Sequence, residues 1–182
     1  MKRIHSFIVA SPGVGKSTLI NRVLGALGCP IFGYLTRKEQ DEWDEDLGHP
    51  IYIYPAGQAQ KRSKDNLVGY CKDRRPTVYP EVFDRFAPHL REPISEGAVI
   101  LMDEIGFMEA SSPAFCEGIF GLLDGNIPVI AAVKDKDTEF LKKIRSHPKV
   151  RCFYLTPENR DAIFTQVIEY MKTGDSLFSD KE

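Results

Sequence analysis

The stretch Ala10-Ser11-Pro12-Gly13-Val14-Gly15-Lys16-Ser17-Thr18 decides the fold that we predict for this chain of 182 residues. It follows a short apolar run, Ile4 to Ala10, which is typical of a buried strand. Behind it, apolar residues recur at steps of one and three from Leu19 to Leu27, which predicts one face of an amphipathic helix. A glycine-rich loop that joins a strand to a helix and ends in Gly-Lys-Ser is the pattern of a phosphate-binding P-loop.

The residue types of this loop suit a triphosphate. Glycines let the backbone curl so that several N–H groups point at phosphate oxygens, and the helix that follows adds the positive end of its dipole. We expect Lys16 to bring a positive charge to the β- and γ-phosphates and the Ser17 hydroxyl to bind Mg²⁺. The motif has glycine where this chain has Ala10, and alanine fits if the backbone there is still strand-like, because only a positive φ excludes it. We therefore predict that residues 10–18 bind a nucleotide.

Strand-like and helix-like segments alternate along most of the chain. The predicted strands cover residues 4–10, 31–35, 98–103, 128–133 and 150–155. Four helices are predicted. The first covers residues 19–27, the second starts after Ser112-Pro113, the third starts after a cap near Asp137, and the fourth starts at Thr156-Pro157. Gly118 and Gly121 weaken the second of these. This alternation predicts the α/β class, as a three-layer P-loop fold with a mostly parallel five-stranded sheet.

The middle of the chain departs from this pattern. Residues 51–54 are predicted to pair with the strand near residue 33 as a hairpin, across the acidic turn 41–46. Trp43 in that turn is either an exposed aromatic residue or a platform for a base. Residues 57–95 show basic clusters but no clear periodicity, so we interpret residues 36–95 as an insertion near the active face. Residues 1–174 then form one domain, and residues 175–182 a polar C-terminal tail.

Two acids end the apolar run that begins at Ala98. Asp103 is predicted to hold magnesium through water, opposite Ser17. Glu104 would then lie beside the γ-phosphate, where it can orient or deprotonate a water molecule. The alternative is a glutamate that merely ends the strand. By analogy with other P-loop ATPases, residues 128–133 should lie between the P-loop strand and this one.

Composition excludes several classes of protein. Lysine and arginine number 24 against 26 acidic residues, a net charge of −2, which argues against a nucleic-acid binder with a broad basic face. The longest apolar runs span about five residues, against the ~20 of a membrane helix. The four cysteines are far apart and the four histidines lack ligand spacing, so we expect reduced thiols, a cytoplasmic location and no zinc site.

The run Asp103-Glu104-Ile105-Gly106-Phe107-Met108-Glu109 resembles the D-E-I-G-x-M-E signature of a family of small nucleoside-triphosphatases, the cancer-related nucleoside-triphosphatases and their thermophile relatives. Two further stretches, Gly33-Tyr34-Leu35-Thr36 and Glu158-Asn159-Arg160-Asp161, are similar. The resemblance implies a RecA-like P-loop fold and slow, magnesium-dependent hydrolysis of several nucleoside triphosphates. The chain departs from the family at Ala10, at Arg37-Lys38-Glu39 and at Lys134-Asp135, which bears on substrate preference and rate.

Three residues are accessory candidates. Lys134 either senses the γ-phosphate or is solvated. Arg160 is either an arginine that stabilises charge, within the chain or across a dimer, or a surface residue at a helix start. Glu109 either braces the loop after Glu104 or faces solvent.

These observations favour a nucleoside-triphosphatase in which Lys16 and Glu104 are catalytic and a nucleoside triphosphate is the partner. No Asn-Lys-x-Asp stretch follows residues 128–133, so base selectivity should be weak. One alternative is a small kinase, with residues 57–91 as acceptor site and lid. Another is a nucleotide-gated binding module with negligible turnover. Phosphate release without an acceptor distinguishes the nucleoside-triphosphatase from the kinase and from the binding module.

Overall fold

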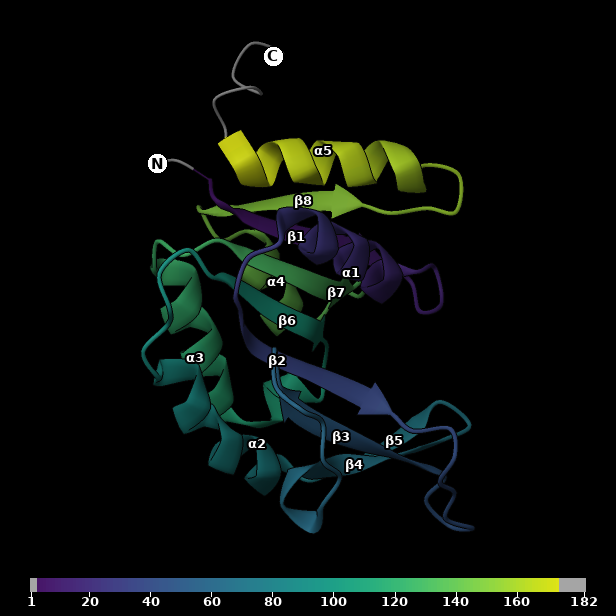
Figure 1. Cartoon of the computed structure of the whole chain (residues 1–182). Helices are drawn as coiled ribbons and strands as arrows, with labels where there is room; N and C mark the ends of the chain where they lie inside the picture. Colours follow the sequence, from purple (N-terminus) through teal and green to yellow (C-terminus); the bar gives the residue numbers. More distant parts are fainter. Residues whose placement is uncertain (1–2, 174–182) are drawn as a thin grey trace.

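The structure, a computed structural model, describes residues 3–173. Within that range the chain forms eight strands: β1 (His5–Ala10), β2 (Ile31–Lys38), β3 (His49–Pro55), β4 (Leu67–Lys72), β5 (Arg75–Val78), β6 (Val99–Ile105), β7 (Val129–Lys134) and β8 (Val150–Tyr154). They build one sheet in the order β5-β4-β3-β2-β6-β7-β1-β8 (Figure 1). The five strands from β2 to β8 in this order run parallel. The predicted α/β fold with a five-stranded parallel core is confirmed.

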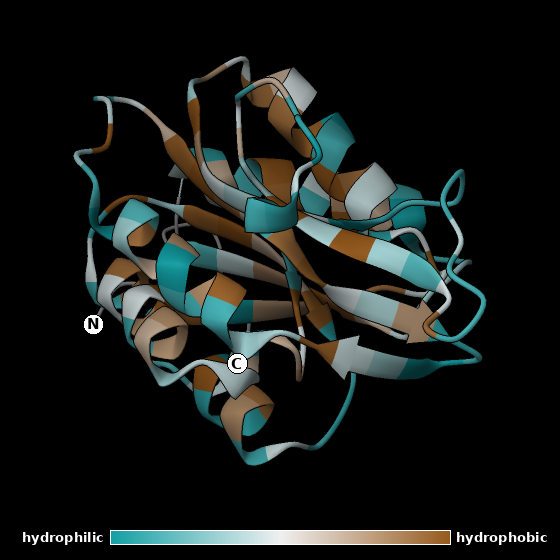
Figure 2. Cartoon of the chain, turned by 90° about the horizontal axis from the view of Figure 1, so that it is seen from below, coloured by the Kyte–Doolittle hydropathy of each residue, from teal (hydrophilic) through white to brown (hydrophobic). Residues whose placement is uncertain are grey.

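Helices cover both faces of the sheet. They are α1 (Lys16–Leu27), α2 (Pro80–Phe86), α3 (Pro113–Asp124), α4 (Glu139–Arg145) and α5 (Arg160–Thr173). Helices α1 and α5 pack on one face, and α2, α3 and α4 pack on the other. The result is a three-layer molecule in which hydrophobic residues lie both on the strands and on the helices that cover them (Figure 2).

The central strands are apolar because both of their faces are covered. In β6, Ile100 and Met102 enter the core on the α3 side, while Val99 and Leu101 enter the core on the α1 side. Successive side chains of a strand point to opposite faces, so a strand between two helical layers needs apolar residues at every position. This explains why the predicted parallel strands lie within a few residues of the observed ones.

The predicted start of α3 agrees with the structure, whereas the predicted start of α5 does not. Ser112 caps α3 as predicted, since its Oγ accepts a hydrogen bond from the Phe115 N–H at 3.1 Å. The glycines do not prevent this helix, and Gly118 has a packing role because a Cβ there would lie 2.8 Å from Leu90 Cδ1. The prediction that the last helix opens at Thr156-Pro157 is wrong. Asn159 holds residues 156–159 in a turn, accepting from Thr156 N at 2.8 Å and donating to Tyr154 O at 3.0 Å.

The predicted hairpin is confirmed, but the sheet continues beyond it. Strands β2 and β3 pair antiparallel, and β4 and β5 extend the sheet where no periodicity was visible. The end of the same segment, α2, packs beside α3 in the core. Residues 57–95 therefore belong largely to the sheet and its covering layer. The predicted C-terminal tail, residues 175–182, lies outside the described residues.

No helix in residues 3–173 is long and apolar enough to cross a membrane.

Gly33 permits the close approach of β2 to β6. Its φ is +111°, and a Cβ at this position would lie 2.1 Å from Leu101 O. The carbonyl of Gly33 also accepts a hydrogen bond from Ala56 N at 2.9 Å, which joins the residue after the end of β3 to β2. A glycine here therefore fixes the strand that runs on to Thr36, next to the carboxyl end of β6.

We predict that Gly33→Ala destabilises the protein by about 2–4 kcal/mol, from backbone strain and the clash with β6. The matched control is Gly25→Ala, because Gly25 is in helix α1 and a Cβ there meets nothing within 4 Å. The control should gain about 0.5–1 kcal/mol. Urea unfolding of the two variants measures both values, and a Gly33→Ala protein as stable as wild type would contradict this account of β2.

Candidate active site

The predicted P-loop lies between β1 and α1. Ala10 is the last residue of β1, so its backbone is strand-like and meets the condition under which alanine suits this position. Gly13 and Gly15 have φ values of +81° and +105°, in the region that favours glycine. Gly15 is the N-cap of α1, and no side chain forms a capping hydrogen bond with the first N–H groups of the helix. The loop thus has the curvature and the helix N-terminus that an anion site requires.

Lys16 is a buried cation with partners on two sides. Its side chain is 5% exposed, and Nζ donates to Ala10 O at 3.0 Å and to Ser11 O at 3.3 Å. Nζ also lies 3.2 Å from Glu104 Oε2. A buried ammonium needs such acceptors, and the loop carbonyls hold this one at the mouth of the P-loop.

Strand β7 separates β1 from β6, as the fold analogy predicted. Ala131 of β7 pairs with Phe7 on one side and Met102 on the other. Because the three strands are parallel, their carboxyl ends meet at one edge of the sheet. This places Asp103 and Glu104 beside the P-loop although they follow it by more than 80 residues.

Asp103 contacts the start of α1. Ser17 Oγ donates a hydrogen bond to Asp103 Oδ1 at 3.0 Å. Burial raises the pKa of the Asp103 carboxyl, and nearby Glu104 raises it further, while the Ser17 hydrogen bond and the charges of Arg37 and Lys16 act against this. A hydroxyl and a carboxylate side by side are hard oxygen donors, which suit Mg²⁺ with further ligands from substrate phosphates and water.

Among residues 3–173, no group of three or more His, Cys, Asp or Glu side chains could enclose a metal by itself.

Glu104 lies between two lysines. Its Oε2 is 3.2 Å from Lys16 Nζ, and its Oε1 is 3.2 Å from Lys134 Nζ at the end of β7. One carboxylate thus bridges two ammonium groups. Lys134 was expected either to sense the γ-phosphate or to be a solvated lysine. The structure favours the first alternative, because Lys134 Nζ pairs with Glu104.

The backbone of Glu104 is held by residues that sequence reasoning did not single out. Its N–H donates to Thr36 Oγ1 at 3.4 Å, and Tyr34 Oη donates to its carbonyl at 3.5 Å. Both belong to the Gly33-Tyr34-Leu35-Thr36 stretch of β2. The resemblance of that stretch to the family was the available signal, but only the parallel pairing of β2 with β6 gives it a role.

Glu109 is buried behind the site, with only 4% of its surface exposed, so the solvent-facing alternative is wrong. Its Oε2 accepts a hydrogen bond from Gly106 N at 2.7 Å, which ties the loop that follows Glu104. Burial raises the pKa of Glu109 to about 7, against the opposing effects of its backbone hydrogen bonds and the Lys134 charge. Glu109 thus braces this loop from the interior.

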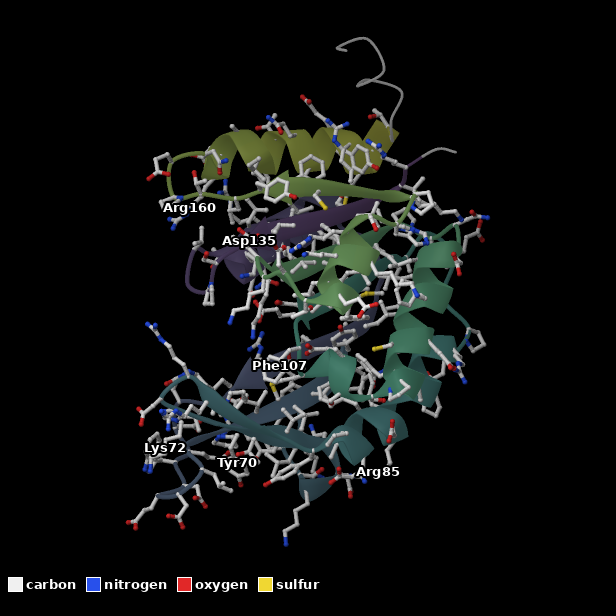
Figure 3. The ribbon with its side chains drawn as sticks, turned by 180° about the vertical axis from the view of Figure 1, so that it is seen from behind. Tyr70, Lys72, Arg85, Phe107, Asp135 and Arg160 are labelled. Carbon is white, nitrogen blue, oxygen red and sulfur yellow. The ribbon has the colours of Figure 1, made fainter. Side chains whose placement is uncertain are left out.

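Arg160 lies on the other side of the P-loop from Glu104. It is the first residue of α5, and its Nε donates to Val14 O at 3.1 Å. Figure 3 shows Arg160, Asp135 and Phe107 in that order from the top of the view towards its middle. The predicted site residues therefore lie together at the carboxyl edge of the sheet, with Arg160 at one end.

Comparisons with known proteins identify the family of the chain. A family model described as "NTPase" matches residues 5–168. The nucleoside-triphosphatase THEP1 of Pyrococcus abyssi is 30% identical over 166 residues, covering 89% of each chain. The cancer-related nucleoside-triphosphatase homolog of Bos taurus is 28% identical, covering 93% of this chain and 97% of its own. The crystal structure of THEP1 from Aquifex aeolicus superposes with a TM-score of 0.72 at 26% identity, covering 93% of this chain and 99% of that one.

The raised pKa of Glu109 predicts a pH-dependent stability. An unfolded glutamate ionises near 4.5, but in the folded protein Glu109 keeps its proton until about pH 7. Its contribution to stability is therefore fully present below pH 4.5 and is lost as the pH rises towards 7. We expect Glu109→Gln, which cannot ionise, to gain stability over wild type, by about 2 kcal/mol more at pH 8 than at pH 5.5.

Urea unfolding at these two pH values measures the gain. The control is Glu117→Gln, because Glu117 lies on the exposed side of α3, where its side chain is 74% exposed and its carboxylate contacts only the exposed Arg91, at 3.4 Å, among the described ion pairs. A Glu109→Gln difference from wild type that is the same at both pH values would contradict the buried, late-ionising carboxyl.

Proposed function

Because the chain belongs to the NTPase family, we propose that it hydrolyses nucleoside triphosphates to the diphosphate and phosphate, with Mg²⁺ as cofactor and little selectivity among bases. The observation that carries this proposal is the position of Glu104. Its carboxylate lies 3.2 Å from the P-loop Lys16 and 3.2 Å from Lys134, beside the Ser17–Asp103 pair.

The first step is the capture of the triphosphate by the P-loop. Lys16 Nζ now donates to two neutral carbonyl oxygens, those of Ala10 and Ser11. Charged phosphate oxygens are stronger acceptors for an ammonium group, so a bound triphosphate competes well for it. The N–H groups at the start of α1 and the loop amides supply the remaining donors.

Magnesium suits the oxygen pair of Ser17 and Asp103, and when bound it would neutralise charge on the β- and γ-phosphates. The Ser17 hydroxyl already donates to Asp103, so the two ligands are oriented before the substrate arrives.

Glu104 is the group that can accept a proton from water. When phosphate oxygens take over the charges of Lys16 and Lys134, both carboxylate oxygens of Glu104 lose their partners. A water between Glu104 and the γ-phosphorus then gives its proton to the carboxylate, as its oxygen bonds to phosphorus and the bond to the β,γ-bridging oxygen breaks. Lys16 and the loop N–H groups stabilise the negative charge that develops on the diphosphate.

Weak base selectivity and a cytoplasmic location complete the proposal. After β7 the chain reads Asp135-Lys136-Asp137, which lacks the Asn-Lys-x-Asp device for reading guanine. All four cysteines are free thiols, as expected in a reducing compartment.

We predict that Glu104→Gln lowers the rate of phosphate release by at least about 100-fold, while the nucleotide still binds, because glutamine keeps the size of the side chain but cannot take up a proton. Lys16→Ala should instead abolish tight nucleotide binding. Magnesium-dependent phosphate release from ATP, GTP, CTP and UTP measures the rate, and titration calorimetry measures binding.

Two outcomes would overturn the proposal. Wild-type turnover in Glu104→Gln would exclude Glu104 as the base. A rate that rises strongly with one added acceptor, with the phosphate recovered on that acceptor, would identify a kinase instead.

A further inference from the structure

Arg160 is fixed against the P-loop by two independent features. Its Nε donates to Val14 O at 3.1 Å, and its Cζ lies 3.9 Å from the place where a Cβ of Gly15 would be. The turn that delivers it, residues 156–159, is closed by the two Asn159 hydrogen bonds described above. The guanidinium is therefore held at the rim of the loop by its own contact and by the turn that precedes it.

Most of this guanidinium remains available to a ligand. Arg160 is exposed. Within residues 3–173, neither of its terminal nitrogens donates a hydrogen bond to protein, and no carboxylate lies within 4 Å of them. Nε has an acceptor, while the two terminal amino groups have none, and one face of the guanidinium is turned towards Gly15, which leaves the opposite face for a ligand.

The sheet order indicates which part of a nucleotide comes near Arg160. Lys134 and Glu104, where the γ-phosphate is expected, lie at the carboxyl ends of β7 and β6, on one side of β1. Arg160 follows β8, on the other side of β1. Figure 3 shows the same separation, with Arg160 at one end and Phe107, just after β6, at the other. A triphosphate lying along the P-loop with its γ end at Glu104 directs its nucleoside towards β8 and the start of α5.

We propose that Arg160 binds the nucleoside by stacking its guanidinium on the face of the base. The inference rests on the proposed function, because it takes the orientation of the triphosphate from the position of Glu104. A guanidinium stacks on any aromatic face and needs no particular pattern of donors and acceptors. Arg160 thus provides affinity for the nucleoside without selecting a base, and it does not stabilise charge at the γ-phosphate.

The test compares two ligands that differ only by a nucleoside. ADP and pyrophosphate both offer a diphosphate to the P-loop, and neither is consumed by the proposed reaction. Titration calorimetry in magnesium should show that Arg160→Ala weakens ADP binding about 3- to 30-fold and leaves pyrophosphate binding unchanged within about twofold. Arg160→Lys, which keeps the charge but not the planar group, should lose most of the same affinity.

Two control variants isolate the effect. Arg22 of α1 pairs with Asp161 of α5 and lies over the ring of Phe164. Arg22→Ala therefore perturbs the packing of α5 on α1 without removing a contact to the P-loop. Trp43, in the β2–β3 connection, lies beyond β6 from the P-loop, so Trp43→Ala removes the other candidate platform for a base. Both variants should bind ADP as wild type does.

Kinetics give a second readout. Arg160→Ala should raise KM for ATP with kcat nearly unchanged, since stacking on the base is equal in the ground state and the transition state. A fall in kcat, or equal weakening of ADP and pyrophosphate, would assign Arg160 to the phosphates or to the shape of the loop and overturn the inference. Unchanged ADP affinity in Arg160→Ala would do the same.

The failure of this inference differs from the failure of the proposed function. A wild-type protein that binds ADP better than pyrophosphate, and loses that preference in Arg160→Ala, but releases no phosphate from ATP, would support the role of Arg160 and reject hydrolysis. A wild-type protein that binds neither ligand would reject both.

Discussion

The position of one strand controls the whole site, although that strand carries only one of its residues. Strand β7 lies between β1 and β6, and neighbouring strands are about 4.8 Å apart. The P-loop and the Asp103–Glu104 pair are therefore roughly 10 Å apart at the backbone, a gap that a lysine and a glutamate can close with their side chains. The Lys16–Glu104 contact at 3.2 Å is the result.

Local charge, rather than net charge, adapts the molecule to its substrate. The chain carries a net charge of −2, yet Lys16 and Lys134 both pair with the carboxylate of Glu104. Buried Glu109 carries a cost, because its carboxyl is desolvated while it ties the backbone at Gly106. A group that lowers stability near neutral pH, but fixes the loop after Glu104, is consistent with selection for the site rather than for stability.

Much of this site could be predicted from sequence because motif and periodicity agree. Ala10 to Thr18 identifies β1, the loop and α1 together, and the apolar run before Asp103 identifies β6. Strands β4 and β5 could not be predicted, since Gly69 and Pro76 interrupt them and most of their residues are only partly buried or exposed. The Lys134–Glu104 and Thr36–Glu104 contacts join residues 30 and 68 positions apart. Such contacts depend on strand order, which no local pattern contains.

The central claim is that Glu104 exchanges its lysine partners for water when a triphosphate binds. A crystal structure with magnesium, ADP and aluminium fluoride, which mimics the phosphate in transfer, tests it most directly. The account predicts Lys16 and Lys134 within about 3 Å of ligand oxygens, and Glu104 hydrogen-bonded to a water that faces the fluoride group. A Glu104 that still pairs with both lysines, or that faces away from the ligand, would contradict it.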